Sequence, residues 1–376
     1  MKKRAKGSLF SFATIILALT MILTACGGNQ TSSTSNEKDN GKETGGKSTE
    51  LIFGIAVPAS HVINVKGIEP WAEKVKQETN GSATINIQAG GVLGGTKTVI
   101  QDVSGGVYDI GLAVGKFFPD SPLFKSTVLD LPFLFSKSDD HLLKAKIAKK
   151  FMEQYLEEDL KKLGVKIVGI YLSDPAVLAS TKPIRTAEDL KGKKTQFDLP
   201  SYEPLFKSWD AVPVSMAIED IYSGLEKGTM DVAIYAFGGM YSQKFYEPAP
   251  YITNLPVSNS VQAVIMNQAK WDSLSPETQK KFDDSLDANL EEALNVAYAD
   301  GAKESKEKIK AELKGKGEII ELSPKELAKF TAPAEAVWKE WIKEADKKGY
   351  DGKKLVNGVL KIMEEEGLEP PFEFKN

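Results

Sequence analysis

The chain has 376 residues, with 48 lysines and arginines against 52 aspartates and glutamates, a formal net charge of −4, one cysteine and two histidines. This length allows one large or two medium domains, and a single cysteine excludes a disulfide framework. Lysine-rich stretches alternate with glutamate, so we expect no basic stripe for nucleic acid. With two histidines and no hydrolase, zinc-protease or phosphate-loop motif, the sequence gives little basis for a metal site, a cofactor or catalysis.

The first 26 residues have the pattern of an export signal. Basic residues at positions 2–6 precede an apolar run from Leu9 to Ile22, which is shorter than the roughly 20 residues of a membrane-spanning helix. Leu23–Cys26 then resembles a bacterial lipobox, whose cysteine receives a diacylglycerol and becomes the new N-terminus. We therefore predict a signal peptide over 1–25 and lipid attachment at Cys26. The protein would be held at the outer face of the cytoplasmic membrane.

Residues 26–50 are predicted to be a lipidated, flexible tether, because positions 27–50 contain no large apolar side chain. The folded sequence begins with a predicted strand over 51–55, followed by a helix over 67–78 and a strand over 83–88. This alternation continues to about residue 260 and indicates an α/β fold with largely parallel sheets. Long helices are predicted beyond it, over 276–313, 324–346 and 353–366.

A faint internal duplication suggests two similar lobes. Residues 99–112 and 218–234 both read as a helix, a Gly-x-x-Asp turn and an apolar strand. Glycine suits the end of the helix, since it tolerates positive φ, and aspartate can bond its own backbone in the turn. A chance similarity of two strand–helix units remains the alternative.

Aromatic residues and glycines follow each repeated strand, in Gly115–Phe118 and Tyr235–Gly239. Ligands of parallel sheets bind beyond the carboxyl ends of the strands. If the lobes face each other, these loops would line one cleft. The alternative is that the rings belong to the core. The candidate ligand residues from these loops are Lys116, Phe117, Phe118, Tyr235 and Phe237.

Over nearly its whole length beyond residue 50, the chain resembles the solute-binding proteins of TRAP (tripartite ATP-independent periplasmic) transporters of the dicarboxylate-binding DctP type. No single motif decides this, but many occur in the order of the family. The matching stretches are Trp71–Val75, Glu78–Gly81, Gly91–Gly94, Asp130–Phe135, Pro183–Ile184, Asp189–Lys194, Ala211–Val214 and Tyr222–Asp231.

The resemblance implies a two-lobed, type II periplasmic-binding-protein-like fold, with a ligand cleft between the lobes and crossover strands at the hinge. The helix over 276–313 would span both lobes. Lobe 1 would take 51–173 and 258–300, and lobe 2 would take 174–257 and 301–376. The implied function is non-enzymatic: the protein captures a small organic solute and delivers it to the small and large membrane subunits of an ion-gradient-driven transporter.

Two positions depart from the family's ligand site. The family's motif D-L-K-G-x-K-x-R ends in an arginine that binds the ligand's carboxylate through two charge-assisted hydrogen bonds, but here Gln196 occupies that position. Tyr235 stands where relatives often have an asparagine. Because a buried carboxylate needs a compensating cation, we expect an uncharged or zwitterionic solute. The alternative is that Lys116 or Arg185 binds a carboxylate instead.

Two further residues are candidate ligand contacts. His61 follows the first strand, although a solvated loop histidine fits the sequence equally well. Asp198 lies two residues after Gln196, on the same face of the predicted strand, and could meet a ligand ammonium group.

Competing functions and several properties stay open. A binding lipoprotein that serves a sensor kinase would need the same fold, and an extracytoplasmic enzyme would need a nucleophile or an acid–base pair that the sequence does not reveal. The identity of the solute and the oligomeric state are not determined by the sequence.

Overall fold

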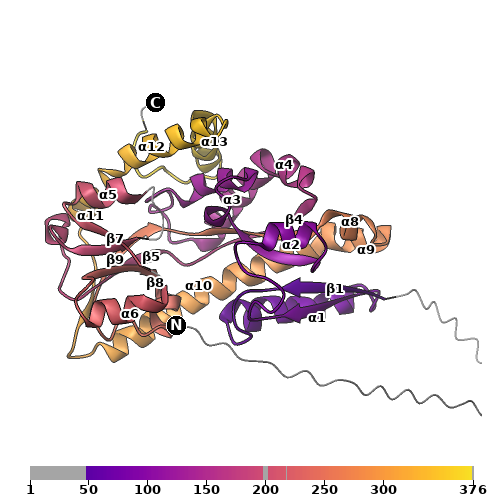
Figure 1. The fold of residues 1–376 in the computed structure, drawn as a ribbon, viewed down its shortest axis with the longest axis horizontal. Coiled ribbons are helices and arrows are strands. Elements are labelled where there is room, and N and C mark those ends of the chain that lie inside the picture. Colours follow the sequence, from indigo (N-terminus) through magenta and orange to yellow (C-terminus); the bar gives the residue numbers. More distant parts are fainter. Residues whose placement is uncertain (1–47, 198–201, 217, 375–376) are drawn as a thin grey trace, which may run out of the picture. The chain divides into compact units, whose positions relative to one another are not determined.

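The computed structural model describes residues 48–197, 202–216 and 218–374 (Figure 1), so Cys26 and Asp198 lie outside the described residues. The described residues belong to the compact unit that runs from Gly46 to Asn376. In this described part, none of the helices combines the length and the apolar character that crossing a membrane requires.

The strands form two sheets. Within the described residues, the first sheet has five strands in the order β2-β1-β3-β10-β4, and the second has six in the order β11-β9-β5-β8-β6-β7. The strands of the first sheet are β1 (Thr49–Gly54), β2 (Ala83–Gln88), β3 (Ile110–Val114), β4 (Val165–Leu172) and β10 (Val261–Asn267). Those of the second are β5 (Ala176–Ser180), β6 (Lys194–Phe197), β7 (Val212–Ser215), β8 (Val232–Ala236), β9 (Tyr251–Ser258) and β11 (Glu318–Ile320).

Each sheet contains one antiparallel strand, which the chain supplies when it crosses over from the other sheet. β4 leads through residues 173–175 into β5, which is antiparallel to β8 and β9. β9 leads through residues 259–260 into β10, which is antiparallel to β3 and β4. The other described pairings are parallel, which confirms the prediction of largely parallel sheets.

The two crossover segments are hydrogen-bonded to each other. The backbone N–H of Ser173 donates to the carbonyl oxygen of Ser260 at 2.9 Å, and the N–H of Ser260 donates to Ser173 Oγ at 3.0 Å. Asn259 Nδ2 donates to the carbonyl oxygen of Ser173 at 2.8 Å. The two crossovers between the sheets therefore lie side by side.

The predicted N-terminal elements and the repeated unit are confirmed. β1 and β2 lie at the predicted strands. The predicted helix over 67–78 corresponds to α1 (Glu69–Glu78), which directly follows a π-helical turn, η1 (Asn64–Ile68). The repeat consists of α2 (Val99–Ser104) before β3 and α6 (Ile218–Glu226) before β8. The remaining elements before β9 are the helices α3 (His141–Tyr155), α4 (Glu157–Lys162), α5 (Glu203–Ser208) and α7 (Phe237–Ser242), and the 3₁₀ segments η2 (Gly115–Phe117), η3 (Pro122–Asp130) and η4 (Ala187–Leu190).

The long C-terminal helices are present, with interruptions. The predicted helix over 276–313 consists of α9 (Pro276–Lys281), a π-helical turn η6 (Phe282–Leu286) and α10 (Asp287–Glu312). The predicted helix over 324–346 is divided at Pro333, since proline cannot donate the helical hydrogen bond. Its parts are α11 (Pro324–Thr331) and α12 (Ala334–Lys347); α13 (Gly352–Glu365) follows, and the short α8 (Gln268–Asp272) precedes α9.

The helix α10 packs on both lobes. Its residues Leu290 and Leu294 belong to the core beneath the first sheet, together with Phe53, and Ile309 belongs to the core beneath the second, together with Val177. Figure 1 shows α10 running past strands of both sheets. A single rigid element therefore connects the two lobes in addition to the crossover segments.

The last two helices, within the residues 301–376 assigned to lobe 2, also contact lobe 1, although Ala334 and Val337 of α12 belong to a core cluster of the second lobe. The ring of Trp341 in α12 stacks on Phe124 of η3, with centroids 5.6 Å apart, and Leu355 and Val359 of α13 share a buried cluster with Ile170 of β4. Helical periodicity indicates that one face of α12 and of α13 is buried, but it does not indicate which lobe covers that face.

Candidate functional site

A cavity of about 560 Å³ lies where the first lobe, the second lobe and α10 meet. This volume falls within the range of pockets that hold small organic ligands. Its described lining comes from the loop after β1 with η1, from the crossover after β4, from α7 and the residue after it, and from α10. The lining residues are Pro58, Ser60, His61, Val62, Val65, Lys66, Asp174, Gly238, Gly239, Ser242, Gln243, Tyr298, Gly301, Ala302, Glu304, Ser305 and Lys308.

Asp174 is the buried carboxylate of this cavity, with 3% of its surface exposed. The N–H of Gly238 donates to its Oδ2 at 3.1 Å, so the crossover residue caps the start of α7. Burial raises the pKa of Asp174 to about 6, and hydrogen bonds from the backbone of Gly238, of Asp174 itself and of Phe237 limit this rise.

Glycine at position 239 lets the backbone of α7 approach the ring of Tyr235. A Cβ atom at this position would lie 2.1 Å from Tyr235 Cε1, which no side chain could accommodate. The ring of Tyr235 also meets Phe245 edge-on, with centroids 5.3 Å apart. The glycines of α7, which begins directly after β8, thus let this helix pack against β8 and help to shape the wall of the cavity.

Tyr298 of α10 lies between this cavity and a second one of about 60 Å³. Its ring lies parallel to that of Tyr171, with centroids 5.8 Å apart, and Tyr171 donates a hydrogen bond to Gln262 Oε1 at 2.7 Å. Burial and the charge of Asp174 raise the pKa of Tyr298 far above its usual value. Tyr298 therefore presents a neutral phenol ring to the cavity.

One carboxylate at the rim of the cavity, that of Glu304, is shared by two lysines. Glu304 Oε1 lies 2.7 Å from Lys308 Nζ, and Glu304 Oε2 lies 3.6 Å from Lys66 Nζ. Burial lowers the pKa of His61, so its imidazole stays neutral at pH 7. Among the described lining residues, the cavity therefore has two paired cations at its rim and the carboxylate of Asp174 inside.

Of the predicted ligand residues, His61 lies in the described lining of this cavity, with its ring 6.4 Å from that of Tyr298. Gln196 lies instead between β6 and β8, 2% exposed, where its Oε1 accepts a hydrogen bond from the N–H of Ile234 at 3.3 Å. Its amide ties two strands whose described backbone pairing is limited to Thr195 and Val232.

The predicted aromatic residues do not gather around this cavity. Phe118 and Phe237 are each 5% exposed and belong to different core clusters, which is the alternative that the sequence left open for such rings. Phe117 packs at the edge of the first of these clusters, and Lys116 Nζ lies 5.6 Å from its ring centroid. Phe237 nevertheless begins α7, whose next two residues line the cavity.

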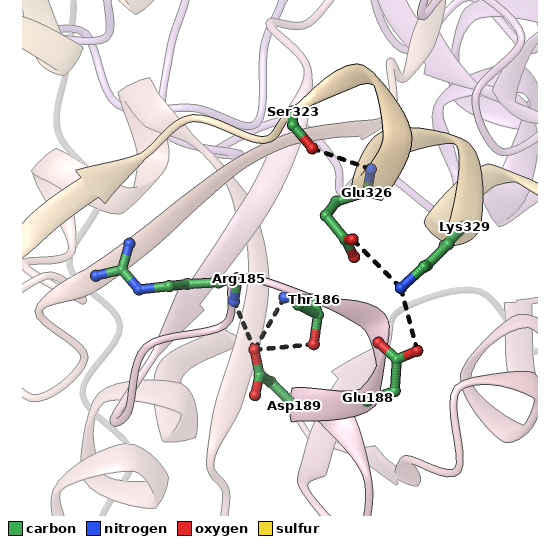
Figure 2. Close-up of polar contacts among 7 residues, drawn as sticks. All are labelled: Arg185, Thr186, Glu188, Asp189, Ser323, Glu326 and Lys329. Atoms are coloured by element: carbon green, nitrogen blue, oxygen red, sulfur yellow. Dashed lines mark hydrogen bonds and ion pairs between the residues drawn. The ribbon is translucent and has the colours of Figure 1, made fainter.

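Arg185, the alternative partner for a carboxylate, is engaged elsewhere. Its guanidinium forms an ion pair with Glu318 of β11, and its side chain is 54% exposed. Figure 2 shows the side chain extending away from Asp189, which accepts hydrogen bonds from the backbone N–H groups of Arg185 and Thr186. In the same view Lys329 bridges Glu188 and Glu326, so these ion pairs connect η4 and α11.

Asp174 and Tyr298 both line the cavity, and neither is among the ligand residues predicted from the sequence. Asp174 could have been found from its place, since it is the first residue after the predicted lobe boundary at 173. Tyr298 lies on a helix that alternates small, apolar and charged residues, and its sequence carries no signal for the side that faces the cavity.

Curated relatives are solute-binding proteins. The 2,3-diketo-L-gulonate-binding periplasmic protein YiaO of Escherichia coli is 29% identical over 224 residues, which cover 59% of this chain and 66% of the relative. The ectoine-binding periplasmic protein TeaA of Halomonas elongata is 22% identical over 311 residues, which cover 81% of this chain and 88% of the relative.

Solved structures have the same fold. A TRAP periplasmic solute-binding protein from Desulfovibrio salexigens matches with a TM-score of 0.73 and 24% identity over 87% of this chain and 99% of that chain. The sequence pattern of the DctP family, described as bacterial extracellular solute-binding protein, family 7, matches residues 53–344. The chain belongs to this DctP family, has its two-lobed type II fold, and is a solute receptor of the TRAP transporter type.

Proposed function

We propose that this receptor binds its solute in the 560 Å³ cavity at the junction of the lobes. The observation that carries the proposal is the composition of the lining, which includes the loop after β1 from the first lobe, α7 from the second lobe and α10 from the connecting helix. A solute in this position would touch both lobes at once, so its binding energy would favour a closed arrangement over an open one.

The charge of the buried groups supports an uncharged or zwitterionic solute. Gln196 replaces the arginine expected from the family motif, Arg185 pairs with Glu318, and the two rim lysines, each about half exposed, share the carboxylate of Glu304. A carboxylate buried deeper in the cavity would therefore lack the buried cation that it requires. The relatives cover both possibilities, since YiaO is named for an acid and TeaA for ectoine, which is a zwitterion.

The decisive experiment is a binding screen on the purified full-length protein. Candidate solutes would include ectoine, sugar acids, dicarboxylates and hydroxybenzoates, each tested by thermal shift and then by calorimetric titration. A solute at 100 times its dissociation constant should stabilise the protein by about 2.7 kcal/mol. Micromolar binding of succinate or malate would contradict the proposed solute class, and the absence of any stabilising solute would contradict the proposed binding cavity.

We further propose that Cys26 carries a lipid that holds the receptor at the outer face of the cytoplasmic membrane. The support is the export-signal pattern that ends in Leu23–Cys26. In cells that make the protein, Cys26→Ser should move the receptor from the membrane fraction to the soluble fraction. Wild-type protein should show the mass of a diacylglyceryl group on its N-terminal cysteine. A variant that stays in the membrane fraction would contradict the anchor.

A further inference from the structure

Asp174 is a buried carboxylate for which the described residues provide no cation. It lies in the crossover between β4 and β5, lines the cavity and is 3% exposed. Its carboxylate accepts hydrogen bonds from backbone N–H groups, that of Gly238 at 3.1 Å among them, and no lysine or arginine of the described residues forms an ion pair with it. A carboxylate in this environment is stabilised by backbone dipoles alone.

This arrangement leaves the ionised form under-compensated. Burial raises the pKa of Asp174 to about 6, so at pH 7 the group is largely ionised although it has lost most of its hydration. An ionised group in such surroundings is costly unless an opposite charge accompanies it. A cationic group entering the cavity would supply that charge.

The neighbours of Asp174 do not supply the cation themselves. His61, across the cavity, is kept neutral because burial lowers the pKa of its imidazole. Lys66 and Lys308 both lie within ion-pair distance of Glu304 at the rim. Both lysines thus share one carboxylate at the half-exposed rim, and among the described residues neither forms an ion pair with Asp174, whose charge is therefore available to a ligand.

The aromatic ring of Tyr298 adds a second feature that favours a cation. Tyr298 lines the cavity and is close enough to Asp174 for the carboxylate's charge to raise its phenol pKa. One face of its ring lies over Tyr171, which fixes the ring's orientation. Aromatic rings attract ammonium groups through their electron-rich faces, and a carboxylate beside the ring strengthens the attraction.

We propose that Asp174 and Tyr298 form a subsite for a cationic nitrogen, so that the solute carries a protonated amine or a quaternary ammonium group. This inference rests on the proposed function, because it assigns the chemistry of the same cavity. Within the solute class proposed above it selects zwitterions over uncharged solutes, and it adds amines to that class; acids without a cationic nitrogen stay excluded.

The test compares compounds that share a skeleton and differ in charge, on purified full-length protein at pH 7.5. One series is tyramine, tyrosine and 4-hydroxyphenylpropionate; a second is carnitine, γ-aminobutyrate and butyrate; ectoine and 3-hydroxybenzoate complete the panel. We expect binding by members that carry a cationic nitrogen. For these, Asp174→Asn should raise the dissociation constant at least about 10-fold, in line with the loss of one charge-assisted contact.

Two further variants make the result specific. Asp300→Asn removes an exposed carboxylate from α10, the helix that carries Tyr298. Because Asp300 is outside the described lining of the cavity, this variant should leave the dissociation constant within about 2-fold of the wild-type value. Tyr298→Leu should weaken the cationic compounds more than 3-fold, and it provides a second measurement if Asp174→Asn folds poorly. Circular dichroism and thermal unfolding would establish that each variant is folded.

The outcomes separate this inference from the proposed function. If acids alone bind, or if cationic compounds bind Asp174→Asn as tightly as the wild type, the ammonium subsite is wrong while the protein remains a receptor that uses this cavity. If neither this panel nor the wider screen yields a stabilising compound, both the subsite and the proposed cavity are overturned.

Discussion

At the scale of single residues, Asp287 at the start of α10 is a built-in source of instability at neutral pH. Its Oδ1 is buried and has no hydrogen-bond partner among the described residues. Burial raises its pKa to about 8, with Asp283 and Glu291 adding to the rise and Lys166 and Lys149 opposing it. A raised carboxyl pKa contributes stability that is complete below the unfolded value near 4 and is lost as the pH rises to 8.

We therefore predict that Asp287→Asn stabilises the protein at pH 8. The neutral amide avoids the desolvated charge, and because one pKa unit corresponds to about 1.4 kcal/mol, a gain on the order of 2 kcal/mol or more is expected. At pH 4 the gain should shrink, since the aspartate is then protonated in the folded protein. Urea unfolding at both pH values measures the difference.

The control for this prediction is Asp284→Asn. Asp284 is exposed and pairs with Lys280 one helical turn away, so its removal should change the free energy of unfolding by at most about 0.5 kcal/mol. Equal unfolding free energies for wild type and Asp287→Asn at pH 8 would show that the carboxylate is hydrated or paired after all.

Gln196 is the second residue at which a single change is informative. Gln196→Arg restores the charge expected from the family motif at a position that is 2% exposed. Without an anionic partner, the buried guanidinium should lower the free energy of unfolding by about 3 kcal/mol. Urea unfolding in the presence of succinate or 3-hydroxybenzoate should recover part of that loss if the position opens toward a bound solute.

The matched control is Gln196→Met, which keeps the size of the side chain and removes the acceptor for the N–H of Ile234. Its cost should be about 1 kcal/mol, the usual net value of one hydrogen bond, and no acid should reverse it. A Gln196→Arg variant as stable as wild type in plain buffer would mean that an anion already sits within reach.

At the scale of elements, α10 completes the hydrogen bonding of an edge strand. β4 ends the first sheet, and among the described residues no strand lies beside the outer side of its backbone. Asn295 on α10, 1% exposed, accepts from the N–H of Leu172 at 3.1 Å and donates to the carbonyl oxygen of Ile170 at 3.0 Å. Glu291 accepts from the N–H of Ile170 at 2.9 Å. The helix thus covers an edge that would otherwise be open for pairing.

Asn295→Ala should accordingly destabilise the protein by about 2–3 kcal/mol, because it leaves buried backbone groups of β4 without partners. Asn289→Ala, the same change at a half-exposed position of α10, serves as the control and should cost less than about 1 kcal/mol. Chemical unfolding of both variants gives the comparison, and similar losses in the two would show that the bonds to β4 contribute little.

These elements show which features of the fold could be predicted from the sequence and which could not. The strands and helices were predictable because hydrophobic periodicity is local: β2 and the repeated α2–β3 and α6–β8 units have the predicted type and place. The bonding of Asn295 to β4 was not predictable, because it joins residues more than 120 positions apart and asparagine on a helix is usually solvated. Pro333 could have been recognised as a break, since proline interrupts helical hydrogen bonding.

For the candidate site, too, the position of a segment along the chain was predictable from the sequence, whereas the contacts of its side chains were not. Of the segments expected to approach a ligand, the described cavity is lined by Gly238 and Gly239, which lie in α7, and by His61. Phe118 and Phe237 face cores instead, because the direction of a side chain at the end of a strand depends on packing that the sequence does not record. The ligand roles assigned to the candidate residues remain predictions.

At the scale of the whole molecule, the exchange of β5 and β10 makes each sheet depend on the other. Each of these strands sits inside its sheet, between two neighbours, and is reached only by a crossover from the opposite sheet. The core residues of α10 are likewise divided between the two lobes. Loss of one lobe would therefore release an internal strand of the other and expose a face of α10.

We predict that the two lobes unfold in a single transition. Scanning calorimetry on the full-length protein should give one peak whose calorimetric and van't Hoff enthalpies agree, although two-lobed proteins of this size often depart from two-state behaviour. Tryptophan emission should report the same midpoint in Trp209→Phe, which removes a core tryptophan of the second lobe, as in Trp271→Phe, which removes one from the first.

A bound solute provides the sharper form of this prediction. If the lobes unfold together, a solute that touches both should move the single calorimetric peak to a higher temperature without splitting it. The reason is that stabilisation of the folded state is shared by every residue that unfolds with it. If the lobes unfold independently, the solute should split the peak or move only one part of it. Two transitions with separate midpoints, reported by Trp209 and by Trp271, would mean that the crossover strands and α10 couple the unfolding of the two lobes less strongly than the topology implies.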